Sequence, residues 1–196
     1  FRFEDDIEKN GIVGDAISSN QQILVQVVKE PISTKGPRIS SELSLAGRYM
    51  VLVPFSERIS ISQKIDSQEE KNRLKRLVQS IKPKGFGVIV RTVAKDKKVA
   101  ELDADLQQLI QRWKNMCSRL TKISKYPTKV LSEIDRSSSI LRDIFDDSFT
   151  GIYVDDKELF VEIGDYIKTI SPKKASIVKH YKDSLPIFEK FGVERQ

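Results

Sequence analysis

The pattern of apolar and polar positions divides the chain into a β-rich beginning and a longer part in which helices alternate with strands. At the beginning, runs of β-branched and other apolar residues are broken by Pro31, Gly47 and Pro54, which are typical of turns and strand ends. The runs that predict strands lie at residues 22–29, 41–46, 48–53 and 59–61. The sequence therefore predicts an all-β opening with short connections.

Further along, apolar residues recur at a period of 3.6 and predict amphipathic helices. A helix at 66–81 has acidic residues in its first turn, with Leu74 and Val78 on its apolar face. A longer helix at 99–123 carries a stripe that we interpret as core rather than as a cofactor site, with the members Trp113, Met116 and Cys117. Further helices are predicted at 137–145, 157–169 and 186–191, and strands at 85–92, 128–134, 151–154 and 176–181.

Length and composition are compatible with this mixed α+β or α/β fold. With 196 residues, 39% of them apolar, the chain can form one large domain or two small ones with a buried core. No apolar run approaches the roughly 20 residues that cross a bilayer, and the beginning of the chain has no signal-peptide pattern. We therefore expect a soluble, cytoplasmic protein, and the start at Phe1 rather than Met suggests a fragment.

The positive charge of the chain is concentrated in one stretch. Between Lys64 and Lys98 there are 11 Lys and Arg residues against 4 Asp and Glu residues, whereas the whole chain has a net charge of +6. Such a concentration favours a polyanionic partner, nucleic acid before membrane, because no basic helix with bulky aromatic anchors accompanies it. The alternative is a solvated, lysine-rich face.

Within this stretch, Arg91 and Thr92 follow the β-branched run at 88–90. A guanidinium offers paired donors for phosphate oxygens, and a neighbouring hydroxyl adds one more hydrogen bond, so this pair at a strand end is suited to binding a phosphate. The alternative is an ordinary strand end with a solvated arginine. These two residues alone do not decide between the interpretations.

The sequence lacks the motifs of several enzyme classes. It has no glycine-rich phosphate loop, no dinucleotide fingerprint and no Gly-x-Ser-x-Gly elbow. Because His180 is the only histidine and Cys117 the only cysteine, histidine-based triads, disulfides and Cys-rich zinc sites are not expected. We interpret His180 as structural or solvent-facing, and the carboxylate pairs at 146–147 and 155–156 as helix caps and turns rather than metal ligands. The sequence predicts neither a catalytic centre nor a metal site in these 196 residues.

Four segments form a specific combination. They read Val25-Gln-Val-Val-Lys-Glu-Pro-Ile-Ser-Thr-Lys-Gly-Pro-Arg38, Ser44-Leu-Ala-Gly-Arg-Tyr-Met-Val-Leu-Val-Pro54, Gly87-Val-Ile-Val-Arg-Thr92 and Leu185-Pro-Ile-Phe-Glu-Lys-Phe191. Together they resemble the N-terminal half of the bacterial ribonuclease E/G family, from about residue 22 to the end of the chain. The resemblance implies part of an S1 (OB-type) β-barrel at 1–42, an α/β sensor for the RNA 5′ end at 43–136, and an incomplete RNase H-like α/β subdomain at 137–196.

The resemblance also implies roles for individual residues. By motif position, Arg91 and Thr92 would hold a 5′-monophosphate, and Gly47 and Val51 would support the same pocket with their backbone, with the Val51 amide as a donor. Lys35 resembles a basic S1-domain residue that touches RNA. The sequence departs from the family where glycine usually comes soon after the Arg-Thr pair, since Val93, Ala94 and Lys95 stand there.

For the whole protein, the resemblance implies a hydrolytic endoribonuclease that acts on single-stranded RNA in rRNA processing and mRNA decay. The magnesium-dependent catalytic part and the cysteine pair of a zinc link would lie beyond the end of this sequence, so the chain alone is expected to be inactive and to bind neither metal. Homo-oligomers of the full-length protein are compatible with this family. Two alternatives stay open: an RNA-binding adaptor without 5′-end selectivity, and a protein-interaction scaffold whose lysines serve only solubility.

Overall fold

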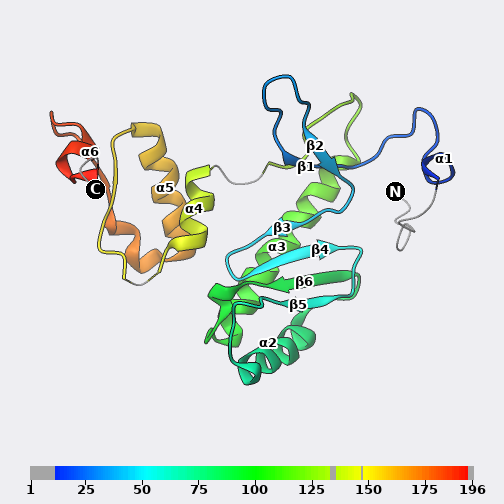
Figure 1. Ribbon diagram of the computed structural model, residues 1–196, viewed down its shortest axis with the longest axis horizontal. Helices are drawn as coiled ribbons and strands as arrows, with labels where there is room; N and C mark the ends of the chain where they lie inside the picture. Colours follow the sequence, from blue (N-terminus) through cyan, green and yellow to red (C-terminus); the bar gives the residue numbers. More distant parts are fainter. Residues whose placement is uncertain (1–11, 133–135, 147, 194–196) are drawn as a thin grey trace. The chain divides into compact units, whose positions relative to one another are not determined.

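The computed structural model describes residues 12–132, 136–146 and 148–193. The chain divides into two compact units, Phe1–Leu131 and Ser132–Gln196, and each has its own cluster of buried apolar residues (Figure 1). The first unit contains every residue of the predicted phosphate site.

The first unit is built on a four-stranded sheet with the order β3-β4-β6-β5. These strands are β3 (Leu45–Ala46), β4 (Met50–Pro54), β5 (Ile59–Ile61) and β6 (Phe86–Val90). Strand β4 is antiparallel to both neighbours, with Met50 opposite Val90 and Ala46 opposite Val51, whereas β5 runs parallel to β6. The end of β6 is therefore beside the beginning of β4, and the Arg-Thr pair lies next to the turn that joins β3 to β4.

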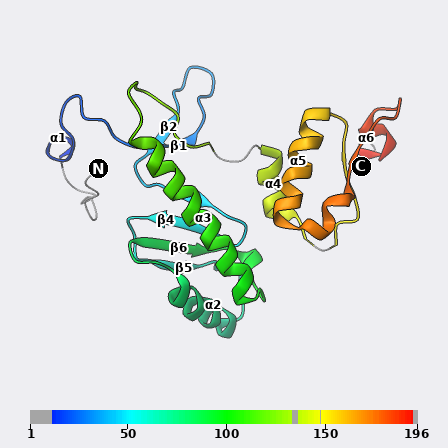
Figure 2. The ribbon, with the colours of Figure 1, turned by 180° about the vertical axis from the view of Figure 1, so that it is seen from behind.

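Two helices cover the apolar side of this sheet. Helix α2 (Gln68–Ile81) packs against β5, and α3 (Val99–Leu120) packs against β3 and β4; Figure 2 shows α3 running across the strands. Side chains alternate along β4, so that Met50 and Leu52 are fully buried. The other buried members of the core come mainly from the predicted helical stripes, namely Leu74, Val78, Leu102, Leu106, Leu109, Ile110, Trp113 and Met116. Cys117 is half-buried against this core, and burial raises the pKa of its thiol.

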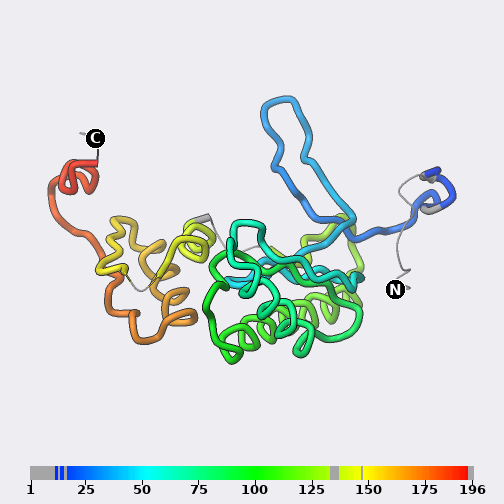
Figure 3. The backbone as a smooth tube through the Cα atoms, turned by 60° about the horizontal axis from the view of Figure 1, so that its bottom comes forward, coloured from blue at the N-terminus to red at the C-terminus, as the bar shows by residue number. Residues whose placement is uncertain are grey.

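A hairpin precedes the sheet. Strand β1 (Gln26–Lys29) pairs antiparallel with β2 (Arg38–Ser40), and Figure 3 shows the long loop between them; a short helix, α1 (Val13–Ala16), comes before. The strand predicted at 22–29 is shorter in the structure, where it corresponds to β1. Of the strand predicted at 41–46, only β3 is present. The described residues contain no closed barrel. The assignment of this region to an S1 domain stays a prediction.

The second unit is a small parallel sheet with one covering helix. Strand β7 (Ile152–Val154) pairs with β8 (Val178–His180), and helix α5 (Lys157–Ile170) packs on both. The other helices are α4 (Arg136–Ile144), the 3₁₀ helix η2 (Pro172–Ile177) and α6 (Ile187–Lys190). Its buried core consists of Leu141, Phe145, Val154, Ile163 and Ile167. Its assignment as an RNase H-like subdomain, like the bounds of the three predicted domains, stays a prediction.

The structure confirms a mixed α+β class and corrects one predicted element. The strand predicted at 128–134 is wrong for residues 128–132, and its remainder lies outside the described residues. Val130 and Leu131 pack against the core of the first unit without a partner strand. Strand propensity alone does not make a strand, because a ladder needs a neighbour. The strand predicted at 176–181 is shorter, since η2 extends to Ile177.

Candidate functional site

The candidate site is built around the turn that connects β3 to β4. The Gly47 amide donates to the Met50 carbonyl at 2.8 Å and closes the turn. The carboxylate of Asp105, on helix α3, accepts hydrogen bonds from the next three backbone amides, those of Arg48, Tyr49 and Met50, at 3.0, 2.9 and 3.0 Å. A side chain from the covering helix thus fixes the backbone of this turn.

Arg91 is held against the same turn at both its backbone and its side chain. Its backbone amide donates to the Tyr49 carbonyl at 2.9 Å, and its Nη1 donates to the Gly47 carbonyl at 3.0 Å. The structure therefore brings Arg91 together with Gly47, which lies 44 positions earlier in the chain. The carbonyl contact orients the guanidinium at the edge of the sheet.

Thr92 begins the 3₁₀ helix η1 (Thr92–Ala94) and is exposed. Its hydroxyl lies 2.8 Å from the hydroxyl of Ser62, which follows β5 and donates its amide to the Val90 carbonyl at 2.9 Å. Because β5 and β6 are parallel, their carboxyl ends meet at one edge, and the two hydroxyl groups lie there together.

Val51 lies inside the sheet rather than at its edge. It is opposite Ala46 on β3 and Ile89 on β6. Hydrogen-bonded and non-hydrogen-bonded pairs alternate in an antiparallel ladder, and since the Arg91 amide bonds to Tyr49, the amide of Val51 is directed toward Ile89. Donation by this amide to a bound phosphate stays a prediction.

Lys35 belongs to a different element. It is exposed in the loop of the β1–β2 hairpin, where its backbone pairs with Ile32 through hydrogen bonds of 3.0 and 3.1 Å. Its predicted contact with RNA is therefore separate from the cluster that contains Arg91 and Thr92.

Charge around the site is unevenly distributed. Exposed lysines follow both hydroxyl residues, Lys64 after Ser62, and Lys95 and Lys98 after Thr92. On the side of the core, burial raises the pKa of the Asp105 carboxyl, while the three amide hydrogen bonds and the positive charge of Arg91 act in the opposite direction.

The loop that follows η1 is tied to helix α2 by an ion pair. Arg73 donates to Glu70 at 2.6 and 2.7 Å and to the Lys97 carbonyl at 3.1 Å, and Glu70 also accepts the Asp96 amide at 2.9 Å. The hydrogen bond from Arg73 is the main reason that the pKa of Glu70 falls to about 2. This pair fixes the segment that carries the lysines after Thr92.

Sequence reasoning did not identify Asp105 or Ser62. Asp105 belongs to a helix that looks like an ordinary amphipathic helix, and its partners are more than 50 positions away. Ser62 looks like a polar residue at the end of a short strand. The one local signal was Gly47, because a glycine at a strand often marks a place where another group approaches the backbone closely.

The other polar candidates have local structural roles. His180 stacks on Phe160 with ring centroids 5.2 Å apart, and its Nε2 lies 3.3 Å from the Asp155 carbonyl oxygen. Asp156 caps α5 by accepting the Leu159 amide at 2.7 Å, which confirms the capping interpretation. Asp146 accepts the Ser148 amide at 2.8 Å, and Asp147 lies outside the described residues.

The described ranges lack two kinds of feature. No group of three or more His, Cys, Asp or Glu side chains there is arranged to hold a metal ion. None of the helices described combines the length and the apolar character that crossing a membrane requires.

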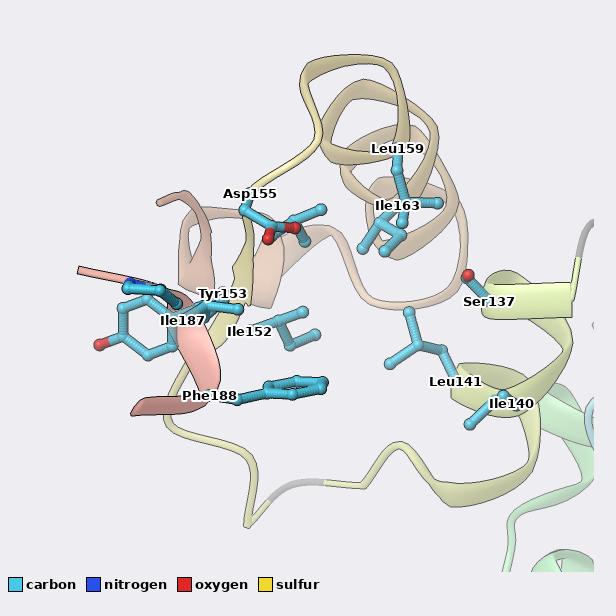
Figure 4. A pocket seen from close by; sticks show the side chains of 12 residues that line it. Ser137, Ile140, Leu141, Ile152, Tyr153, Asp155, Leu159, Ile163, Ile187 and Phe188 are labelled. Atoms are coloured by element: carbon cyan, nitrogen blue, oxygen red, sulfur yellow. The ribbon is translucent and has the colours of Figure 1, made fainter. Parts of the chain in front are cut away.

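The second unit has a shallow, apolar hollow of about 550 Å³. Figure 4 shows Leu141, Ile152 and Phe188 around it, and Asp155 is the one acidic residue of its lining. An apolar lining of this kind does not suit a phosphate. The hollow is therefore not part of the candidate site.

Comparison with known proteins gives a family. The sequence profile described as "Ribonuclease E/G family" matches residues 44–196. Ribonuclease G of Haemophilus influenzae is 34% identical over 93% of this chain and 37% of its own length, and ribonuclease E of a Nostoc species is 32% identical over 92% of this chain and 27% of its own length. The RNase P protein of Staphylococcus aureus is a structural match with a TM-score of 0.32 and 24% identity, over 37% of this chain and 75% of that one. That score is too low to support a fold assignment.

The chain thus spans about a third of the length of the curated relatives that it matches. The profile covers the whole candidate site, from the turn at Gly47 to Arg91 and Thr92, and continues through the second unit. The chain belongs to the ribonuclease E/G family.

Proposed function

We propose that this chain is the RNA-binding and 5′-end-sensing part of an endoribonuclease. In this role it binds the 5′-monophosphate of a single-stranded RNA and positions the strand for hydrolysis elsewhere in the protein. The ribonuclease relatives support the class of substrate. Processed transcripts, which begin with a monophosphate, would be bound in preference to primary ones.

One observation carries the proposal, namely the position of Arg91 and Thr92 at one edge of the sheet. Arg91 is oriented by the Gly47 carbonyl, and the hydroxyl of Thr92, the next residue along the chain, lies 2.8 Å from that of Ser62. A terminal monophosphate has more negative charge and more free oxygens than an internal phosphodiester. A guanidinium with adjacent hydroxyls therefore favours the terminal group.

Catalysis belongs to other parts of the protein in this proposal. The family resemblance implies a magnesium-dependent catalytic part and a structural zinc, but the described residues contain no side-chain cluster suited to either ion. The residues described here bind and orient RNA. Cleavage of rRNA precursors and mRNA, homo-oligomer formation and a cytoplasmic location are proposed for the whole protein.

Equilibrium binding to RNAs that differ only at the 5′ end tests the proposal. A short single-stranded RNA of one sequence is labelled at its 3′ end and prepared with a 5′-monophosphate, hydroxyl or triphosphate. Since hydrogen bonds to charged groups contribute about 1.5–3 kcal/mol, we expect the monophosphate to bind about 10-fold tighter than the hydroxyl, or more. The bulkier triphosphate is expected to bind less tightly than the monophosphate.

Arg91→Ala is expected to remove most of the preference, and Thr92→Val part of it. Arg76→Ala is the matched control, because it removes the same charge from an exposed position of α2 in the same basic stretch. It is expected to weaken all three RNAs equally, since contacts to internal phosphates do not distinguish the ends. Equal affinity for the three ends with a steep salt dependence would favour an RNA-binding adaptor instead, and absence of RNA binding at low salt would favour a scaffold.

A further inference from the structure

We propose that Asp105 is the positioning residue of the phosphate site, acting through the β3–β4 turn on Arg91. The inference rests on the proposed function, since it assigns to Asp105 the task of holding Arg91 ready for a 5′-phosphate. Asp105 itself does not touch the RNA. Its carboxylate holds the backbone that holds the arginine.

The first step is the contact between Asp105 and the turn. Oδ1 accepts the amide of Arg48 at 3.0 Å, and Oδ2 accepts the amides of Tyr49 and Met50 at 2.9 and 3.0 Å. Three consecutive amides converging on one anion form a strong, directional anchor, because each bond is charge-assisted. The turn is thereby tied to helix α3.

The second step is the contact between the turn and Arg91. The arginine bonds to this turn twice, through its backbone amide to the Tyr49 carbonyl at 2.9 Å and through Nη1 to the Gly47 carbonyl at 3.0 Å. Any shift of the turn away from α3 therefore moves the acceptors that set both the backbone and the guanidinium of Arg91.

The third step is the fit between Asp105 and Gly47. A Cβ at position 47 would lie 2.7 and 2.8 Å from the two carboxylate oxygens of Asp105 and 2.9 Å from Cδ1 of Leu109. The turn approaches α3 so closely that a side chain at position 47 would force Asp105, Leu109 or the turn to shift. Gly47 and Asp105 thus act together: the glycine permits the approach and the carboxylate fixes it.

Charge distinguishes Asp105 from a purely structural hydrogen-bond partner. Burial raises the pKa of its carboxyl, and the three amide hydrogen bonds and the charge of Arg91 oppose that shift by favouring the ionised form. An amide of the same size cannot replace it, since one oxygen would become an NH₂ group that faces backbone N–H donors. Asp105→Asn therefore removes the charge and at least one of the three hydrogen bonds, with little change in volume.

Binding of the 5′-monophosphate and 5′-hydroxyl RNAs to the full chain tests the inference. The preference is the ratio of the dissociation constant of the hydroxyl RNA to that of the monophosphate RNA. For Asp105→Asn we expect this ratio to fall to within about threefold of its value in Arg91→Ala, while the affinity for the hydroxyl RNA stays unchanged. In the Arg91→Ala background, Asp105→Asn is expected to have no further effect on the preference, because it acts through Arg91. Asp103→Asn is the matched control: it makes the same change on the same helix, where the carboxylate accepts only the side-chain amide of Gln107 among the described contacts.

Val78→Ala, a core truncation on α2, is the control that separates a general loss of stability from a loss of Arg91 positioning. It is expected to lower the unfolding temperature and to keep the preference. If Asp105→Asn does not fold, Gly47→Ala displaces the carboxylate without removing its charge and is expected to lose the preference as well.

Three results would overturn the inference. The first is that Asp105→Asn or folded Gly47→Ala keeps the wild-type preference for the monophosphate RNA. The others are that Asp105→Asn lowers this preference further in the Arg91→Ala background, or that Val78→Ala loses as much of the preference as Asp105→Asn does. Absence of any preference in the wild-type chain would instead contradict the proposed function and, with it, the role of Asp105 in phosphate binding.

Discussion

A glycine at residue 47 leaves room for the Asp105 carboxylate in its present position. The close approach, with a virtual Cβ at 2.7 Å from Oδ2, is a steric requirement and not a conformational one, since Gly47 is not among the residues with positive φ. At the residue scale, the geometry of the site therefore depends on the absence of a side chain at residue 47.

Replacing glycines by alanine at two positions is expected to change stability in opposite directions. Gly47→Ala forces the turn or Asp105 to move, and we expect it to lower the free energy of unfolding by about 1–3 kcal/mol. Gly164→Ala, in the interior of α5 with no heavy atom near its added Cβ, is expected to raise it by about 0.5–1 kcal/mol. Urea denaturation measures both, and an unchanged stability of Gly47→Ala would contradict the steric account.

The sequence allowed part of this residue-scale picture to be predicted. The position of Arg91 and Thr92 at a strand end could be predicted, because a β-branched run ends there in a local pattern, whereas their role in binding a phosphate came from the family resemblance and stays a prediction. Asp105 could not be found, because nothing in its own helix distinguishes it from Asp103. Its role comes from amides 55 to 57 positions earlier in the chain, and such a contact has no signature along the sequence.

At the scale of elements, an ion pair on α2 holds the loop between η1 and α3. Glu70 and Arg73 reach the backbone at Asp96 and Lys97, and the Glu70 side chain is only 11% exposed. Asp96 has a positive φ of 60°, a conformation that needs support in a residue other than glycine. The helix therefore stabilises the irregular loop that follows the candidate site.

This ion pair predicts a dependence of stability on pH. The pKa of Glu70 is lowered to about 2 from the usual 4.5, so its contribution is present above pH 4.5 and is lost as the pH falls toward 2. Glu70→Gln is expected to cost about 1 kcal/mol at pH 7, and its difference from the wild type should shrink between pH 5 and pH 2. Chemical denaturation across this range measures the effect.

Glu69→Gln is the control for this pH dependence, because Glu69 is the exposed neighbour in the same first helical turn. It is expected to follow the wild type closely at every pH. A Glu70→Gln penalty that stays constant down to pH 2 would show that the ionised carboxylate is not what holds the loop.

Helices could be predicted more reliably than strands in this chain. The apolar stripes of α2 and α3 are buried as expected, because a period of 3.6 is itself the condition for covering a sheet. The run around Val130 has the composition of a strand and packs on the core, but residues 128–132 form no ladder. Strand formation depends on a neighbour that the local sequence does not specify.

At the scale of the whole molecule, the two units have separate cores and are expected to lose stability separately. Ile167 is fully buried in the second unit, and Ile167→Ala is expected to cost about 2–5 kcal/mol there. Hydrogen exchange should show faster exchange in α5 and β8 and unchanged exchange in α3 and β6. Leu74→Ala, in the first unit, should give the reverse pattern. Equal acceleration in both units would contradict independent cores.

The most direct test of the account is a competition between two RNAs of one sequence, with a 5′-monophosphate and a 5′-hydroxyl, for a limiting amount of the chain. The account predicts that the wild type binds predominantly the monophosphate RNA, whereas Arg91→Ala binds the two in nearly equal amounts. Equal occupancy in the wild type, or an undiminished preference in Arg91→Ala, would contradict it.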